Sequence, residues 1–96
     1  MTAPAHVVEI TYCRLCGWLL RASWISQELL STFAEDLSAV TLQPDATGGV
    51  FEIKLDGDIL WSRKSAGRFP EITELKRLVR DRIAPERPLG HVDKRD

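Results

Sequence analysis

The sequence is poor in the residues that metal centres and disulfide scaffolds need. It has only two cysteines, Cys13 and Cys16, and two histidines, His6 and His91, near opposite ends of the chain. A structural zinc ion takes about four protein ligands, typically two pairs of Cys or His. One cysteine pair supplies half of such a set, so zinc binding would require a dimer. We therefore expect no metal and no bound cofactor within one chain.

Long apolar runs and an excess of one charge are also absent. Lys and Arg total 13 against 14 for Asp and Glu, a net charge of −1. This balance gives no electrostatic reason to bind nucleic acid or an acidic membrane. No stretch approaches the ~20 apolar residues that span a bilayer, and the start lacks the pattern of a secretory signal. We expect a cytoplasmic protein, and in that reducing compartment a lone cysteine pair is more often catalytic or redox-sensing than structural.

Repeats, a glycine-rich phosphate loop and a convincing catalytic triad are missing as well. With 96 residues the chain has enough length for one modest core. We expect a single domain over residues 1–84. Residues 85–96 contain two prolines and little apolar content, which predicts a flexible C-terminal tail.

The cysteines stand where a predicted strand meets a predicted helix. Alternating apolar residues predict a strand over residues 6–12, and an amphipathic pattern predicts a helix over residues 17–36. A Cys-x-x-Cys motif between strand and helix indicates a redox pair. Unpaired N–H groups at a helix start favour a thiolate, the form of sulfur that attacks disulfides. A second sulfur one turn away can close a disulfide and release what the first one captured.

Several details of this site stay open at the level of sequence. The pair could also be two buried structural cysteines without chemistry. Trp18 either has a functional role, in which it shields the cysteines or contacts a partner, or is a core residue of the first helical turn. The glycines of the loop over residues 44–49 either approach the cysteines or form a plain turn. The residues expected to line the site are Arg14, Leu15, Gly17, Trp18, Thr47, Gly48 and Phe69.

The remaining pattern predicts an α/β (α+β) fold with the element order β-α-β-β-β-α. The first and second strands should be parallel, since a helix connects them. Asp56-Gly57 predicts a hairpin turn, because Gly readily takes the positive φ that such turns need. Basic residues of the last helix, Lys76 among them, are expected on its solvated face. The further expected elements are strands over residues 39–42, 50–56 and 59–63, a loop over 65–70 and a helix over 71–83.

Three segments give the chain a resemblance to a known family. They are residues 12–17 (YCRLCG), 44–53 (PDATGGVFEI) and 57–64 (GDILWSRK), followed by the amphipathic closing helix. Together they resemble the selenoprotein W/T/H redox family, also called the Rdx family, and residues 67–70 and 80–85 look like its bacterial, cysteine-containing branch. The resemblance implies a thioredoxin-like two-layer sandwich with a four-stranded mixed sheet.

The same resemblance implies a thiol–disulfide redox protein acting in cell redox homeostasis. Glutathione or thioredoxin would be its reductant, and protein thiols or disulfides its partners. Alternatively, the chain is a redox-responsive binding module without turnover. The second motif position carries selenocysteine in selenoprotein W-like members, which favours Cys16 as the attacking sulfur, whereas the helix-end argument favours Cys13. Ordinary thioredoxins have Gly-Pro between their cysteines, where this chain has Arg14-Leu15, so their substrates and potential do not transfer. Oligomeric state stays open.

Overall fold

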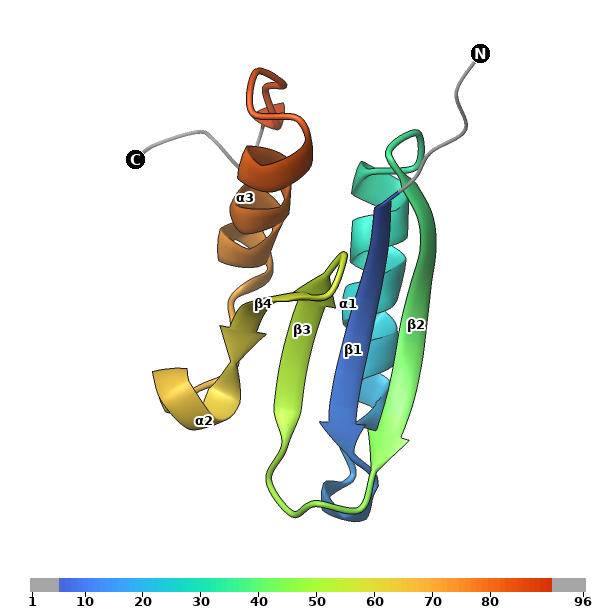
Figure 1. Cartoon of the computed structure of the whole chain (residues 1–96), viewed down its shortest axis with the longest axis vertical. Helices are drawn as coiled ribbons and strands as arrows, with labels where there is room; N and C mark the ends of the chain where they lie inside the picture. Colours follow the sequence, from blue (N-terminus) through green and yellow to red (C-terminus); the bar gives the residue numbers. More distant parts are fainter. Residues whose placement is uncertain (1–5, 91–96) are drawn as a thin grey trace.

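A computed structural model describes residues 6–90, in which four strands form one mixed sheet (Figure 1). The strand order is β2-β1-β3-β4, with β1 parallel to β2 and the other neighbouring pairs antiparallel. The predicted element order is present, with a short additional helix, α2. The elements are β1 (His6–Cys13), the 3₁₀ turn η1 (Arg14–Cys16), α1 (Leu19–Thr32), β2 (Leu37–Asp45), β3 (Phe51–Leu55), β4 (Asp58–Ser62), α2 (Arg63–Ala66) and α3 (Ile72–Ile83).

The β1-α1-β2 unit has the parallel pairing that its long crossover predicts. Val8 lies opposite Val40 and Ile10 opposite Leu42. Strand β2 is longer than expected and continues through Pro44 to Asp45. Proline has no N–H to give to a neighbouring strand, but β2 is an edge strand, so only one of its sides needs partners. The strand therefore extends as far as β1 does.

The hairpin of β3 and β4 turns at Asp56-Gly57, as predicted. Leu55 pairs with Asp58, which leaves two residues in the turn. Their φ angles are +52° and +90°, and a two-residue turn of type I′ needs positive φ at both positions. Aspartate is one of the few non-glycine residues that tolerate this region. The turn fixes which residues of the two strands face the core.

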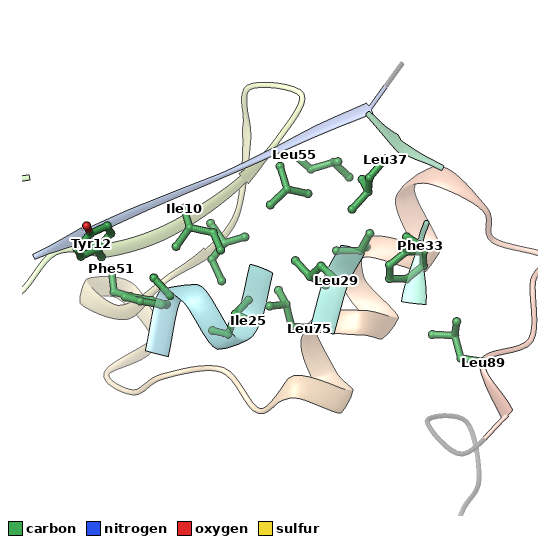
Figure 2. Packing of buried hydrophobic residues seen from close by; sticks show 14 residues of the cluster. Ile10, Tyr12, Ile25, Leu29, Phe33, Leu37, Phe51, Leu55, Leu75 and Leu89 are labelled. Carbon is green, nitrogen blue, oxygen red and sulfur yellow. The ribbon is translucent and has the colours of Figure 1, made fainter. Parts of the chain in front are cut away.

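The core lies on one face of the sheet, between the strands and two helices. Along β3, burial alternates residue by residue, with Phe51, Ile53 and Leu55 inside. Figure 2 shows strand side chains such as Ile10 directed toward Leu29 of α1 and Leu75 of α3. Among residues 6–90, no helix covers the opposite face (Figure 1). Helices on one side of a sheet make a two-layer structure, as expected.

Helix α1 is shorter at both ends than the pattern predicts. It begins at Leu19 instead of residue 17, because Gly17 takes a left-handed conformation with φ of +74°. It ends at Thr32 instead of residue 36, because Phe33 caps it. The carbonyl of Phe33 then accepts the N–H groups of Asp36 and Leu37 in a turn into β2. Amphipathic spacing continues through both ends and does not reveal them.

Part of the predicted tail packs against the domain. Leu89 is 8% exposed and belongs to the hydrophobic core. The Arg87 guanidinium hydrogen-bonds the Asp36 carboxylate and donates to the Thr32 carbonyl at 2.8 Å. Residues 85–90 thus contact the end of α1 where a flexible segment was expected; the rest of that predicted tail lies outside the described residues.

One basic residue of α3 departs from the expected solvated face. Lys76 is only 4% exposed, and its Nζ donates to Glu28 Oε1 at 2.9 Å. The contact joins α3 to α1 across the helical layer. The Lys76 side chain is 6% exposed, so the position belongs to the interface between the two helices. The expectation for Lys76 was wrong because helix spacing alone does not show where a neighbouring helix packs.

Candidate functional site

The topology brings the ends of β1, β2 and β4 and the start of β3 to the same end of the sheet. Cys13 at the end of β1 lies opposite Asp45 at the end of β2. Because β3 runs antiparallel to both of its neighbours, its first residue Phe51 lies beside Tyr12, and Glu52 pairs with Ser62 at the end of β4. We call this end of the sheet, with the η1 turn and α2, the cysteine end. It is the lower part of Figure 1.

Cys13 and Cys16 form a disulfide, with their Cα atoms 5.4 Å apart. The two cysteines have different surroundings. Cys13 is 0% exposed, and its N–H donates to the Val50 carbonyl at 2.8 Å. Cys16 ends the η1 turn and is exposed, as are Arg14 and Leu15 before it. One half of the disulfide is therefore fixed to the sheet, and the other half faces solvent.

The sequence predicted that the cysteines lie at the start of the long helix. The structure does not place them there. The η1 turn and the left-handed Gly17 separate Cys16 from α1, whose N-cap is Trp18. A left-handed glycine ends a helical turn, so the chain changes direction before α1 begins. The first unpaired N–H groups of α1 belong to residues after the motif. The helix-end argument for Cys13 as the attacking sulfur therefore loses its structural basis.

A carboxylate stands beside the buried cysteine. Asp45 is the register partner of Cys13, and it accepts the Thr47 N–H at 2.7 Å. Hydrogen bonds from the Thr47 backbone and side chain lower the pKa of Asp45, so the carboxylate stays charged. Burial and a neighbouring negative charge both disfavour a thiolate. Burial applies to Cys13, which is 0% exposed, and not to the exposed Cys16.

Three aromatic rings pack beside the motif. Trp18 meets Phe69 edge-to-face with ring centroids 4.8 Å apart, and Phe51 meets Phe69 at 5.1 Å. The Arg21 guanidinium lies 4.0 Å from the Phe69 ring centre, and that of Arg63 lies 5.0 Å from it. Trp18 is half-buried and touches both core and surface. The rings join the motif to the segment after α2, and they hold positive charge close to it.

A hollow of about 390 Å³ lies next to this aromatic cluster. It lies between the loop before β3 and the junction of β4 with α2. Val50 connects it to the motif, since its carbonyl accepts the Cys13 N–H. The residues that line the hollow are Thr47, Gly48, Gly49, Val50, Phe51, Glu52, Ser62, Arg63 and Lys64.

The structure places the predicted lining residues in three groups. Arg14, Leu15 and Gly17 form the turn that carries Cys16. Trp18 and Phe69 contact each other in the aromatic cluster, while Thr47 and Gly48 line the hollow.

Sequence reasoning missed the other seven residues that line the hollow, among them Phe51, Glu52, Arg63 and Lys64. The predicted hairpin could have indicated some of these residues, because a hairpin places the end of its second strand beside the start of its first.

Two other kinds of site are absent from the described part of the chain. Across residues 6–90, no three His, Cys, Asp or Glu side chains are grouped so that they could hold a metal ion. In the same range, every helix is too short or too polar to cross a membrane.

Curated proteins with similar sequences come from mammals. The chain is 32% identical to migration and invasion enhancer 1 of Bos taurus over 82 residues, which is 82% of this chain and 68% of that protein. It is 30% identical to the Mus musculus protein of the same name over 76 residues, or 78% of this chain and 62% of that one. The chain thus spans less than two thirds of the mouse relative.

Two crystal structures of bacterial proteins are more similar. One is a protein of Bordetella parapertussis, with 52% sequence identity and a TM-score of 0.78 over 81% of this chain and 98% of that one. The other is the selenoprotein W-related protein of Vibrio cholerae, with 54% identity and a TM-score of 0.77 over 79% and 94% of the two chains. The fold is therefore that of the selenoprotein W-related, thioredoxin-like structures, as predicted. The sequence pattern of the Rdx family matches residues 7–81, and the chain belongs to this redox-associated family.

Proposed function

We propose that the protein is a thiol–disulfide redox protein that cycles Cys13 and Cys16 between dithiol and disulfide. It acts in the cytoplasm in cell redox homeostasis, with glutathione or thioredoxin as its reductant. The observation that carries the proposal is the bonded cysteine pair with one partner exposed and the other fixed to the sheet. A reactive disulfide needs one accessible sulfur and a second sulfur within bonding distance.

The oxidising half of the cycle has two steps. The Cys16 thiolate attacks one sulfur of a substrate disulfide; a Cys16–substrate bond forms, the substrate S–S bond breaks, and the first thiolate leaves and takes up a proton. The Cys13 thiolate then attacks the Cys16 sulfur, and the second substrate thiolate leaves. Two electrons pass from the protein to the substrate, which becomes two thiols. Glutathione or thioredoxin reverses these steps.

Cys16 is the attacking sulfur in this proposal. It is exposed, whereas Cys13 is 0% exposed and lies opposite the charged Asp45. Burial among apolar groups raises the pKa of a thiol and blocks the approach of a substrate. Cys13 suits the second step, since it needs to reach only the neighbouring sulfur.

The second candidate is a redox-responsive binding module without turnover. Four large apolar side chains are exposed at the motif and in the first six residues of α1: Leu15 (74%), Leu19 (50%), Leu20 (82%) and Trp24 (49%). Exposed apolar side chains in one region are typical of surfaces that meet another protein. They support partners among protein thiols and disulfides in either candidate. A partner that binds the Cys13→Ser/Cys16→Ser double variant as it binds the wild type would favour binding without redox control.

A redox titration of the full chain tests the proposal. We expect Cys13–Cys16 to form and break reversibly over a series of glutathione ratios, with free thiols counted at each ratio. Cys13→Ser should accumulate a mixed disulfide on Cys16, because the second step is removed. Cys16→Ser is the matched control, and it should accumulate far less. A pair that fails to form a bond at every ratio would contradict the redox function, and the reverse trapping pattern would contradict the roles of the two sulfurs.

A further inference from the structure

The hollow beside the disulfide has an unequal distribution of charge. Two cations, Arg63 and Lys64, and one carboxylate, Glu52, are among its lining residues. Thr47, Gly48 and Gly49 also line the hollow, and so does Val50, whose carbonyl accepts the Cys13 N–H at 2.8 Å. A molecule in the hollow would thus lie next to the reactive pair and meet a net positive charge.

Arg63 is held in place without a carboxylate partner. Its guanidinium lies 5.0 Å from the ring centres of both Trp18 and Phe69. Its Nε is buried and has no hydrogen-bond acceptor among the described residues. Over residues 6–90, neither Arg63 nor Lys64 has a carboxylate at ion-pair distance.

Elsewhere in the same residues, basic side chains do pair with acids. Arg68 lies 3.0 Å from Glu74, and Arg82 lies 3.6 Å from Asp58. Stacking on rings orients a guanidinium while leaving its charge available to a ligand. Arg63 therefore has the arrangement of a binding group more than that of a structural ion pair.

We propose that the hollow binds the carboxylate end of a small amino-acid-derived disulfide or thiol and presents its sulfur to Cys16. Arg63 and Lys64 receive the carboxylate, and Glu52 receives an ammonium group on the same end of the ligand. This inference rests on the proposed redox function and gives it a substrate class. The bond changes are those written above: one half of the substrate stays on Cys16 while its charged end occupies the hollow, and both halves leave as thiols.

The size of the hollow favours a small molecule over a protein segment. A volume of about 390 Å³ lies at the lower end of the ~300–1,000 Å³ found for small-molecule sites. A zwitterionic end matches the mixed charges of Glu52, Arg63 and Lys64. A neutral or purely cationic disulfide has no group for the two cations. Selectivity by charge is therefore the property that separates this site from an open, unselective disulfide.

The test measures how fast the reduced, full-length protein is oxidised by three small disulfides. Oxidised glutathione carries carboxylates and ammonium groups, hydroxyethyl disulfide is neutral, and cystamine is cationic. We expect the wild type to prefer oxidised glutathione over cystamine. Arg63→Gln should lower that preference by roughly tenfold, the usual value of one hydrogen bond to a charged group. Lys64→Gln should lower it less, and added salt should reduce the effect in the wild type.

Matched variants separate local from general effects of charge. Arg82→Gln makes the same change of charge at the opposite end of the sheet and should leave the preference unchanged. Lys64→Glu should reverse the preference toward cystamine. Since Arg63 packs on two rings, circular dichroism must show that Arg63→Gln is folded; if it is not, the two Lys64 variants decide the result.

Two failures can be distinguished. If none of the three disulfides oxidises the protein, the proposed redox function fails. If all three oxidise it, but the preference is the same in wild type and in the Arg63 and Lys64 variants, the redox function stands and the binding site is overturned. If Arg82→Gln lowers the preference as much as Arg63→Gln does, general electrostatics explains it, and the site is again overturned.

Discussion

The two ends of the sheet hold their basic side chains in different ways. At the end away from the cysteines, three basic side chains pair with acids: His6 with Asp56, Arg82 with Asp58 and Arg87 with Asp36. At the cysteine end, Arg21 and Arg63 lie instead against the ring of Phe69. Paired charges are neutralised and tie segments together. Charges held on rings keep their field, which favours anions and thiolates nearby.

This difference indicates that one end of the sheet stabilises the fold and the other carries the redox site. The far end closes the core with Phe33, Leu37 and Leu89, which are all buried. The cysteine end carries the exposed sulfur, the hollow and the cations. We therefore expect changes at the far end to alter stability and leave redox chemistry unchanged, and changes at the cysteine end to do the reverse. Four measurements test this division.

The largest effect should come from Phe33→Ala at the far end. Phe33 is 0% exposed, and the Arg87 guanidinium lies 5.5 Å from its ring centre. Removing a buried ring leaves a cavity and should cost about 3–5 kcal/mol in the free energy of unfolding, measured with urea. Phe33→Leu, which leaves a smaller cavity, should cost less. An altered rate of oxidation by hydroxyethyl disulfide in the folded variant would break the division between the ends.

A smaller effect is expected where α1 and α3 meet, between the two ends. Glu28→Gln leaves the Lys76 ammonium, whose side chain is 6% exposed, without its acid partner. Breaking a buried pair costs about 3–5 kcal/mol, and because Glu28 is 36% exposed we expect about 2 kcal/mol here. Lys76→Met fills the same space without a charge and should be nearly neutral. Equal losses in the two variants would contradict the view that the unpaired charge is the cost.

Reduction of the disulfide should change stability by a similar or smaller amount. Cys13 and Cys16 are three residues apart in the chain, so the bond closes a very short loop. Short loops lose little entropy on closure, which limits the stabilisation to about 2 kcal/mol. Urea unfolding with and without reductant measures it, and iodoacetamide-capped protein is a control for reoxidation. A loss equal to that of Phe33→Ala would show that the cysteine end also supports the fold.

The smallest effect is a pH dependence at the far end. Hydrogen bonds from His6 and from the Val7 N–H lower the pKa of Asp56 below its usual 3.8. A lowered folded-state pKa gives stability that is fully present above the unfolded-state pKa and is lost as pH falls through the folded-state value. Asp56→Asn should flatten the unfolding free energy over this acidic range, since Asn tolerates the same positive φ but does not titrate. An unchanged pH profile would contradict the role of this carboxylate.

Much of the fold could be predicted because its strands alternate cleanly. The alternation of Phe51, Ile53 and Leu55 predicts both the strand and its buried face. The pair Asp56-Gly57 predicts the turn. The motif at Cys13 and Cys16 was likewise recognisable from its place after a strand. These features depend on residues close together in the sequence, where period and turn chemistry decide the structure.

The remaining details depend on contacts between distant segments. Nothing near Gly17 in the sequence shows that it takes a left-handed conformation and delays the helix. The predicted hairpin returns Arg63 to the end of the sheet where β3 begins, but the packing of Arg63 against the Trp18 ring joins segments that are far apart in the sequence. Leu89 is one apolar residue between prolines and charges, and only the packing of α1 and α3 gives it a place in the core. Local patterns do not contain this information.

The bond between the Cys13 N–H and the Val50 carbonyl has a consequence for any partner that distinguishes the two redox forms. It holds the backbone of Cys13 on the sheet whether or not Cys13 is bonded to Cys16. When the bridge opens, we expect movement to be confined to the few residues from Arg14 to Gly17, while the sheet behind them keeps its shape. A protein that responds to the oxidation state would have to contact that small segment directly, because the rest of its binding surface would be the same in both redox forms.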